Sequence, residues 1–411
     1  MNTGRPRSRR WLWMLIASAV LCQIALNLAR PLISYKVLAL GGDSVTVGLT
    51  SASYALVPVA AALWLGRVSD RRSSLRGIVA VGTLLLAAGP VLLSASPSLP
   101  VVAAASAVLG LGHLCFTIAG QSAIARFVPL SLMDAAFGWF TASFALGQMA
   151  GPLLAGLAMG ASEGVPAGVR LADSNTALLI AGGIAVLAVP FAFGTAAKQE
   201  PAQEKGEKPP PASPRDSVAS LLRYPTVKTN MVASLALLAT TDILVAFLPL
   251  LGEDKGVSPV VVGILLATRA AASIASRLLL PVLLARWRRP SLVIASLAGA
   301  GTTLALLPWL FEFPWAAGGL LALGGFFLGL GQPVTMTLVT QAVPPTSRGA
   351  VLALRLLGNR AGQVTLPAAA GLLAAPVGPS GALWMSCAVL GLACLRRPPG
   401  KQRGHGPGAP D

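Results

Sequence analysis

Charged residues are scarce in this sequence. Asp, Glu, Lys and Arg make up only 11% of its 411 residues, against about 25% in a typical soluble domain. The chain has only two histidines and lacks the Gly-Lys-Ser/Thr sequence that binds nucleotide phosphates. These absences argue against a water-soluble protein, a histidine metal centre and a pump that hydrolyses ATP itself. We therefore predict no enzyme activity, no cofactor and no metal site.

Cysteine is also rare, and its placement argues against a disulfide framework. The four cysteines, Cys22, Cys115, Cys387 and Cys394, all lie within apolar stretches. No two of them lie in loops where they could pair. We interpret them as helix-packing residues.

Long apolar runs dominate the chain. Hydrophobic residues account for 55% of it, and the mean hydropathy is +0.73. Runs of about 20 residues, enough for a helix to cross a hydrocarbon core of about 30 Å, recur along the sequence, and no stretch alternates in polarity like the strands of a membrane barrel. We predict an all-α membrane protein with twelve transmembrane helices, at 12–35, 44–66, 77–95, 99–126, 134–160, 174–195, 227–250, 258–285, 291–311, 314–342, 348–375 and 380–395.

The formal net charge is +17, but the placement of the basic residues argues against nucleic-acid binding. With the N-terminus in the cytoplasm, 23 Lys and Arg fall on the inner side of the predicted helices, and only Lys36, Arg170 and Lys255 fall in outer loops. Membrane proteins concentrate basic residues in cytoplasmic loops. We therefore predict a multi-pass protein of the inner (plasma) membrane with both termini in the cytoplasm.

A polar stretch at 198–224 divides the predicted helices six and six. Its composition is typical of a flexible linker, which leaves tails at 1–11 and 397–411 and six-helix bundles at 12–197 and 225–396. A shift of 215 residues aligns the bundles, which we therefore predict to be homologous. It places Asn27 on Asp242, Val47-Gly48 on Val262-Gly263, and Gly147-Gln148, Pro152 and Gly156 on Gly362-Gln363, Pro367 and Gly371.

Two parallel six-helix repeats, with the substrate bound near the midplane between them, are the architecture of the major facilitator superfamily. The stretch from Gly66 to Arg72, with Asp70 and Arg71, resembles that superfamily's Gly-x-x-x-Asp-Arg/Lys loop, although Arg72-Ser73-Ser74 departs from the usual Gly-Arg continuation. The second half has Ala285 in place of Asp70. The resemblance implies that Gly66, Asp70 and Arg71 stabilise one conformational state. The alternative is a basic membrane anchor.

A second resemblance lies in the fifth predicted helix. Its Gly147-x-x-x-Gly151-Pro152-x-x-x-Gly156 is similar to the helix 5 motif of the superfamily's proton-coupled exporters. The glycines permit close approach of backbones, and Pro152 bends the helix. The resemblance implies a flexible contact with the other half. Plain helix packing by small residues is the alternative.

Ionisable residues inside membrane helices are costly and are functional candidates by default. The predicted helices contain His113, Arg30, Asp242, Arg269, Arg277, Arg355 and Arg360. Asp242 is the only carboxylate well inside a helix, so we predict that it carries the coupling proton, with His113 as the second candidate. The alternatives are a permanent salt bridge of Asp242 with Arg269 or Arg360, and a packing role for His113. We expect these four residues to share one depth.

The excess of arginine over acid in the helices favours an anionic substrate, because guanidinium binds carboxylates through paired hydrogen bonds. The predicted substrate-binding residues are Asn27, Arg30, Arg269, Gln332, Asn359 and Arg360. Alternatively, the polar side chains among them bond to one another across helices.

The sequence thus predicts a monomeric secondary active transporter that exports a small molecule across the lipid bilayer in exchange for protons. Proton-coupled uptake of an organic anion is the near alternative. A membrane sensor or assembly factor without transport is the distant one, because the linker and the tails are short and lack periodic apolar residues.

Overall fold

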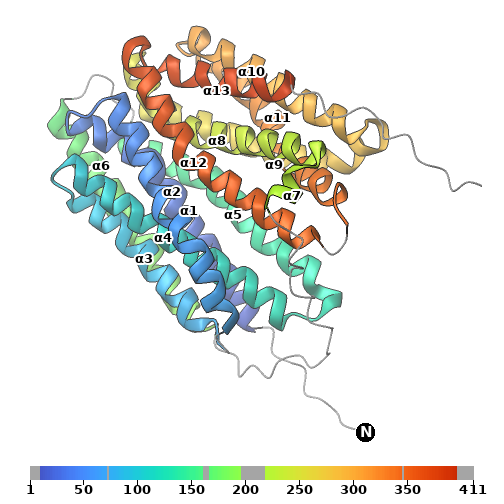
Figure 1. Cartoon of the computed structure of the whole chain (residues 1–411). Helices are drawn as coiled ribbons and strands as arrows, with labels where there is room; N and C mark the ends of the chain where they lie inside the picture. Colours follow the sequence, from blue (N-terminus) through green and yellow to red (C-terminus); the bar gives the residue numbers. More distant parts are fainter. Residues whose placement is uncertain (1–9, 72–73, 161–165, 196–217, 345–346, 396–411) are drawn as a thin grey trace, which may run out of the picture.

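The chain forms a bundle of α-helices in a computed structural model that describes residues 10–71, 74–160, 166–195, 218–344 and 347–395 (Figure 1). Within these ranges all regular elements are helices, twelve of them long and one, α7 (Val218–Leu222), of a single turn. The long helices are α1 (Arg10–Ala39), α2 (Ser44–Arg71), α3 (Arg76–Ala95), α4 (Leu99–Phe127), α5 (Leu130–Met159), α6 (Ala167–Phe193), α8 (Pro225–Asp254), α9 (Pro259–Arg286), α10 (Arg289–Leu310), α11 (Pro314–Gln341), α12 (Arg348–Val377) and α13 (Ser380–Leu395).

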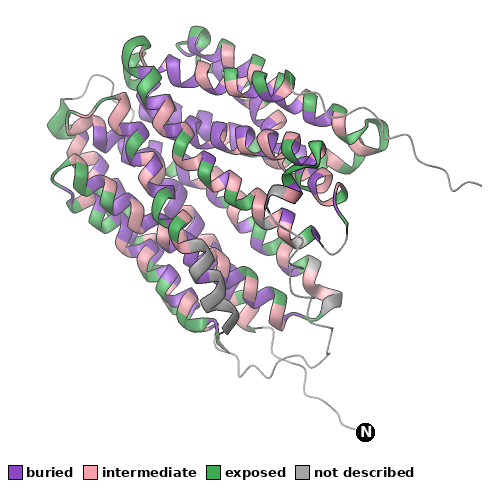
Figure 2. Cartoon of the chain, in the orientation of Figure 1, coloured by how far each residue is buried: buried purple, intermediate pink, exposed green. Residues whose placement is uncertain are grey.

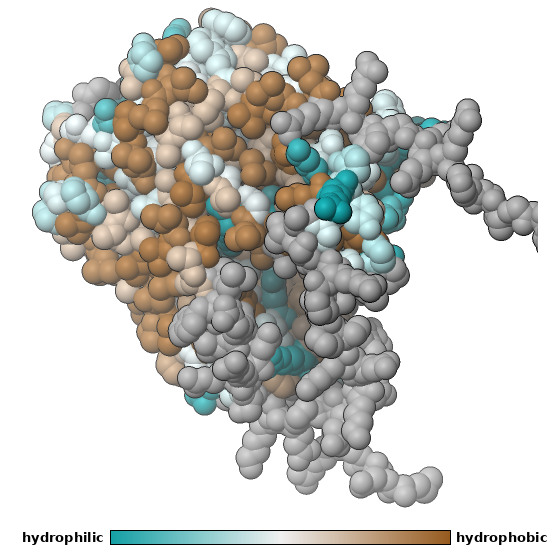
Figure 3. Space-filling view, viewed as in Figure 1, coloured by the Kyte–Doolittle hydropathy of each residue, from teal (hydrophilic) through white to brown (hydrophobic). Residues whose placement is uncertain are grey.

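These helices confirm the twelve predicted spans. Ten of the described helices are long and apolar enough to cross a membrane; α13 is apolar but has only 16 residues, and α12 carries Arg355 and Arg360 within its 30 residues. Exposed residues line the outward faces of the bundle in Figure 2, and apolar residues cover much of the left part of the face in Figure 3. Leu187, Leu278 and Trp315 are among the large apolar side chains on the surface. Such a surface suits lipid rather than water.

The two halves share one packing scheme. In the first half α1 packs against α5 and α6, α3 against α4 and α6, and α2 against α4. The second half repeats this with α8 against α12 and α13, α10 against α11 and α13, and α9 against α11. Across the halves α2 packs on α12 and α5 on α9. The duplication predicted from the 215-residue shift is thus present in the packing.

We call the end of the bundle at which α1 ends and α2 begins the distal end. Two equivalent glycine contacts join the halves there. A Cβ atom added to Gly48 in α2 would lie 3.0 Å from Cα of Gly371 in α12, and one added to Gly263 in α9 would lie 3.1 Å from Cα of Gly156 in α5. Real Cβ atoms rarely come this close, so each contact requires glycine. The 215-residue shift relates the two contacts to each other.

The turn between α1 and α2, at the distal end, fixes where α2 begins. Gly41 has a φ of 79°, a conformation that side chains disfavour. Asp43 then accepts hydrogen bonds from the backbone N–H of Thr46 at 2.9 Å and from its hydroxyl at 2.8 Å, as a helix N-cap does. These bonds hold the pKa of the Asp43 carboxyl below its usual value. The cap sets the register that brings Gly48 against α12.

Polar contacts also join the halves at the distal end. The Ser34 hydroxyl in α1 donates to the Ala246 carbonyl in α8 at 2.7 Å, and Arg170 in α6 pairs with Glu253 in α8 at 3.0 Å. Arg170 was predicted to lie in an outer loop, but it lies within the first turn of α6, where Glu253 of the other half supplies its partner. The halves meet at this end and diverge towards the opposite end of the bundle in Figure 1. This conformation is closed at the distal end.

The end of the predicted linker is not structureless. Residues 218–222 form α7, whose Leu221 is buried against Val227, Val339 and Val343 of the second half. The buried side chain of Leu221 anchors this turn, whereas Leu222 is exposed. The part of the linker before residue 218, from 198 to 217, lies outside the described residues.

Candidate functional site

A cavity of about 200 Å³ lies between the halves, lined by residues of α1, α2, α4, α5, α8, α9 and α12. All four residues predicted to share one depth, His113, Asp242, Arg269 and Arg360, line it. The predicted site residues that line it are Asn27, Arg30, His113, Pro152, Asp242, Arg269, Asn359 and Arg360.

Asp242 stands at the centre of a network that crosses the cavity. Its Oδ1 accepts from the Arg30 guanidinium at 2.6 Å, and its Oδ2 accepts from the Gln363 amide at 2.7 Å. Arg360 in turn donates to Gln363 at 3.0 Å. The predicted alternative to a proton-carrying role was a salt bridge of Asp242 with Arg269 or Arg360, but the ion-pair partner of Asp242 is Arg30. The reason is that α1 and α8 are equivalent helices that pack on each other across the halves, and Arg30 lies one turn after Asn27, the counterpart of Asp242.

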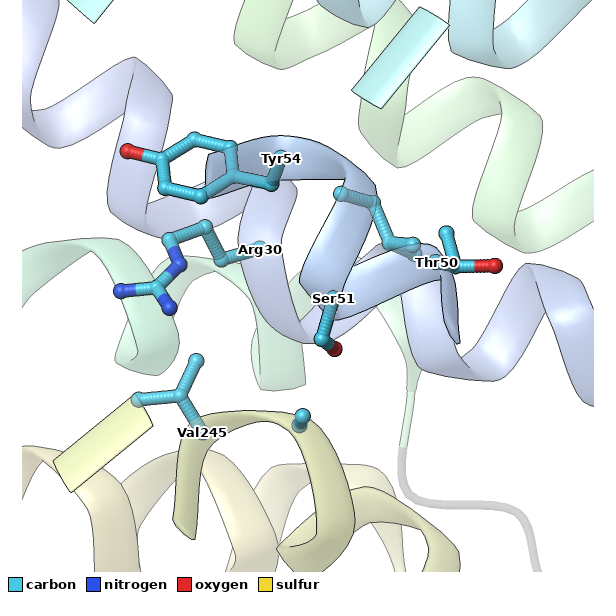
Figure 4. Close-up of a pocket in the computed structure, with 7 residues that line it drawn as sticks. Arg30, Thr50, Ser51, Tyr54 and Val245 are labelled. Carbon is cyan, nitrogen blue, oxygen red and sulfur yellow. The ribbon is translucent and has the colours of Figure 1, made fainter. Parts of the chain in front are cut away.

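Arg30 is held by more than its carboxylate partner. Its guanidinium carbon lies 5.0 Å from the centre of the Tyr54 ring, within range of a cation–π contact. Figure 4 shows Arg30 between Tyr54 and Val245, beside Thr50 and Ser51. These residues line a second cavity of only about 20 Å³. Tyr54 was not among the predicted site residues.

Tyr54 continues into a row of rings on the wall of the first half. Its hydroxyl and Nδ1 of His113 are 2.7 Å apart, and the centre of the His113 ring lies 5.9 Å from that of Phe144. Nε2 of His113 is buried and has no hydrogen-bond partner in the described part of the chain. The His113 ring thus packs against Phe144 and bonds to Tyr54 through Nδ1, whereas its Nε2 atom has no described hydrogen-bond partner.

Arg269 is buried and has no hydrogen-bond partner in the described part of the chain. The residue is only 2% exposed, and its Nε atom has no hydrogen-bond partner among the residues that the structure describes. Its backbone is fixed because α11 approaches it at Gly325, where an added Cβ would collide with the Arg269 carbonyl. A buried guanidinium without hydrogen bonds is costly unless something else supplies them.

Gln332 and Asn359 belong to a separate cluster. The Ser234 hydroxyl lies 3.3 Å from Oε1 of Gln332 and 3.1 Å from Oδ1 of Asn359, and Arg355 donates to Gln332 at 2.8 Å. Asn359 still lines the cavity, whereas Gln332 is not among its lining residues. For Gln332 the structure favours the alternative of bonding across helices.

The helix 5 motif divides its contacts between two partners. Added Cβ atoms at Gly147 and Gly151 would meet the backbone of α1 in the same half, at Gln23 and Asn27. Gly156 instead faces α9 of the other half, and the Pro152 carbonyl faces Gly263 there. The predicted contact between halves is therefore made by the second part of the motif only.

The loop motif at the end of α2 is described only in its backbone. Residues 66–71 are helical there, while the side chains of Asp70 and Arg71, and all of Arg72, lie outside the described part of the chain. Their predicted role, and that of Gly66, stays a prediction.

The cavity carries more positive than negative charge. Arg30, Arg269 and Arg360 line it, whereas Asp242 is the sole carboxylate among its lining residues. Arginine stays protonated in proteins, so the net charge of these groups is positive even with Asp242 ionised. Within the described residues no three His, Cys, Asp or Glu are grouped as metal ligands. The cavity thus presents a positively charged, hydrogen-bonding lining to a ligand.

Comparison with known proteins agrees with this architecture. The sequence matches the Major Facilitator Superfamily over residues 15–324 and again over 231–410. The fold is similar to a bacterial homologue of the human lysosomal transporter Spinster in an inward-facing, unoccupied conformation, with a TM-score of 0.74 and 15% identity over 96% of this chain and 97% of that chain. No individually curated protein matches the sequence.

Two further solved transporters share the fold. The nucleoside transporter NupG matches with a TM-score of 0.72 and 16% identity, covering 94% of this chain and 97% of that chain. A D-xylose–proton symporter matches with a TM-score of 0.71 and 14% identity, again over 94% and 97%. Because the family match extends over nearly the whole sequence and the twelve long helices form two equivalent halves, the chain belongs to the major facilitator superfamily of membrane transporters.

Proposed function

We propose that this protein is a proton-coupled secondary active transporter that moves a small organic solute through the cavity between its halves by alternating access. The observation that carries the proposal is the 2.6 Å ion pair of Arg30 in α1 with Asp242 in α8, which joins the halves inside the cavity. The pair exists only while Asp242 is ionised. A proton on Asp242 therefore removes a contact between the halves and shifts the balance between conformations, as coupling requires.

The direction of transport has two candidates. Efflux by proton exchange is supported by the helix 5 motif, whose Pro152 and Gly156 meet α9 of the other half. Uptake of an organic anion together with protons is favoured by the excess of arginine in the cavity. An imposed pH gradient separates the two, because the substrate moves against the proton flow in exchange and with it in co-transport.

The function is testable in proteoliposomes that contain a pH-sensitive dye. Solutes that the protein transports are expected to move protons across these vesicles, and empty vesicles serve as the control. Reversing the pH gradient gives the direction of coupling. A protein that reconstitutes in folded form but moves no solute in either direction would contradict transport and leave the sensor alternative.

Orientation is a separate prediction. A cysteine at Ser98, between α3 and α4, is expected to react with an impermeant thiol reagent in intact cells, because positive-inside topology puts this loop outside. A cysteine at Gly206 is expected to react only after the cells are permeabilised. Native Cys22 and Cys115 are buried, and labelling of the unaltered protein measures the background from the partly buried Cys387 and Cys394. Labelling at Gly206 in intact cells contradicts the predicted topology.

A further inference from the structure

We propose that the cavity binds a small aromatic carboxylate with a hydroxyl group on its ring, and that a proton is taken up at Asp242 as this anion binds. The carboxylate lies on Arg269, the ring lies against Tyr54, His113 and Phe144, and the hydroxyl bonds to His113. The binding part stands on the cavity alone. The proton part rests on the proposed function.

Arg269 is the arginine of the cavity that is best placed to bind an anion. Arg30 is already paired with Asp242, and Arg360 donates to Gln363. Arg269 lines the same cavity with 98% of its surface buried and no hydrogen bond to any described residue. A guanidinium presents donors in a planar fork that matches a carboxylate through two parallel hydrogen bonds. A bound carboxylate therefore supplies the bonds that the protein does not.

The internal repeat explains why Arg269 lacks a partner. The 215-residue shift places Tyr54 of α2 on Arg269 of α9, and Gly110 of α4 on Gly325 of α11. Each glycine packs against the backbone of the residue that faces it. The same shift places His113, which bonds to Tyr54, on Leu328, which is buried and cannot form a hydrogen bond. The second half thus has a polar residue, Arg269, at the position equivalent to Tyr54, but no residue equivalent to His113 that could bond to it. Arg269 is therefore available to a ligand.

The first half supplies a wall for a planar ring. Tyr54 and His113 are stacked with centres 6.3 Å apart and an angle of 25° between their planes, and Phe144 extends the row. Aromatic rings stack on such surfaces in offset or tilted geometry. Besides Arg269, two other lining residues carry a buried nitrogen without a described hydrogen-bond partner, His113 at its Nε2 and Gln23 at its Nε2. A hydroxyl on the ligand ring can donate to Nε2 of His113 or accept from it, whichever tautomer His113 adopts.

The charges around Asp242 determine how anion and proton interact. The ionisable groups of the cavity that surround Asp242 are Arg30 of α1, Tyr54 of α2, His113 of α4, Arg269 of α9 and Arg360 of α12. The helices α10, α11 and α13 also pack on α8 but contribute no lining residue.

Protonation of Asp242 removes the sole negative charge of these groups and releases Arg30, and both effects strengthen anion binding. By linkage, the anion strengthens proton binding equally. Anion and proton therefore bind together, which favours movement of both in the same direction.

Isothermal titration of the purified full-length protein in detergent tests the ligand class. With 4-hydroxybenzoate as the probe, binding is expected to be stronger than with benzoate, and benzoate stronger than cyclohexanecarboxylate. The neutral 4-hydroxybenzyl alcohol and the cationic 4-hydroxybenzylamine are expected not to bind. Failure of 4-hydroxybenzoate to bind, or equal binding of the alcohol or the amine, overturns the proposed ligand class.

Arg269→Gln tests the site. It is expected to weaken 4-hydroxybenzoate binding by about tenfold or more, because the charged bidentate contact is lost. Arg269→Lys keeps the charge but not the fork and is expected to bind with intermediate affinity. The matched control is Arg277→Gln, two turns further along α9 and exposed, which is expected to bind like the unaltered protein. If Arg269→Gln melts like the unaltered protein and binds equally well, the anion does not lie on Arg269.

Proton uptake during binding separates this proposal from the proposed function. In weakly buffered solution with a pH-sensitive dye, 4-hydroxybenzoate is expected to draw protons onto the unaltered protein but not onto Asp242→Asn. Binding without proton uptake keeps the ligand class and overturns Asp242 as the proton carrier. Proton release on binding overturns the predicted coupling of anion and proton.

Discussion

Asp242→Asn is expected to lower strongly the accumulation of substrate driven by a pH gradient, while exchange of labelled for unlabelled substrate continues. Asn can still accept a hydrogen bond from Arg30, but it cannot bind and release a proton. Uptake of labelled 4-hydroxybenzoate, or of the solute found in the vesicle screen, measures both activities. Accumulation is expected to fall by about tenfold or more, since coupling between two ligands is typically worth about 1–3 kcal/mol.

A purely structural salt bridge predicts a different result. Removing one partner of a buried pair costs about 3–5 kcal/mol because the other charge stays uncompensated, so expression and melting temperature fall together with exchange. The Arg30 side chain is 18% exposed and lies over Tyr54, which makes a smaller loss of stability the expectation here. Asp254→Asn, at the exposed end of α8, is the matched control and is expected to transport normally.

One result would contradict the role of Asp242 as the proton carrier. If Asp242→Asn still concentrates substrate in a pH-dependent way, the proton is carried by another group, and His113 becomes the next residue to test. Its lone unpartnered nitrogen, Nε2, faces the same cavity.

The helices were predictable because the bilayer sets their length. An apolar run must cover the hydrocarbon core, so hydropathy alone locates most helix ends within a few residues. The prediction was poorest at α6, which begins at residue 167 rather than 174. Arg170 looked like a loop residue because its partner, Glu253, lies 83 positions away in the other half. Hydropathy cannot detect a partner that only tertiary packing provides.

Several residues that line the cavity could be predicted from the sequence, but the bonds between them could not. Depth along each helix brought His113, Asp242, Arg269 and Arg360 together, yet depth does not show which side chain meets which across a gap. The partner of Asp242 depends on how α1 faces α8, and that is a property of the assembled halves. Tyr54 could have been identified as a site residue from the sequence, because the internal repeat aligns it with Arg269.

Gly156→Leu is expected to hold the distal end open. A Cβ atom at this position would lie 2.5 Å from the carbonyl oxygen of Pro259 and 3.2 Å from Cα of Gly263 in α9, so only separation of the halves makes room. Overpacking costs about 1–3 kcal/mol, which shifts the balance between closed and open by about 5- to 150-fold. Spin labels at Ser98 and Phe313, in distal loops of the two halves, are expected to move apart, and transport is expected to fall.

The internal repeat supplies the controls for this experiment. Gly371→Leu alters the equivalent contact, against Val45 and Gly48 of α2, and is expected to open the distal end in the same way. Gly138→Leu places the same side chain in α5 where no atom lies within 4 Å of the added Cβ, and is expected to leave the spin-label distance unchanged. Gly151→Leu collides with α1 inside one half, so it is expected to lower stability without opening the distal end. If Gly156→Leu and Gly138→Leu give the same distance between the labels, the glycine contacts do not close the distal end, and closure depends instead on the Ser34 and Arg170 contacts with α8.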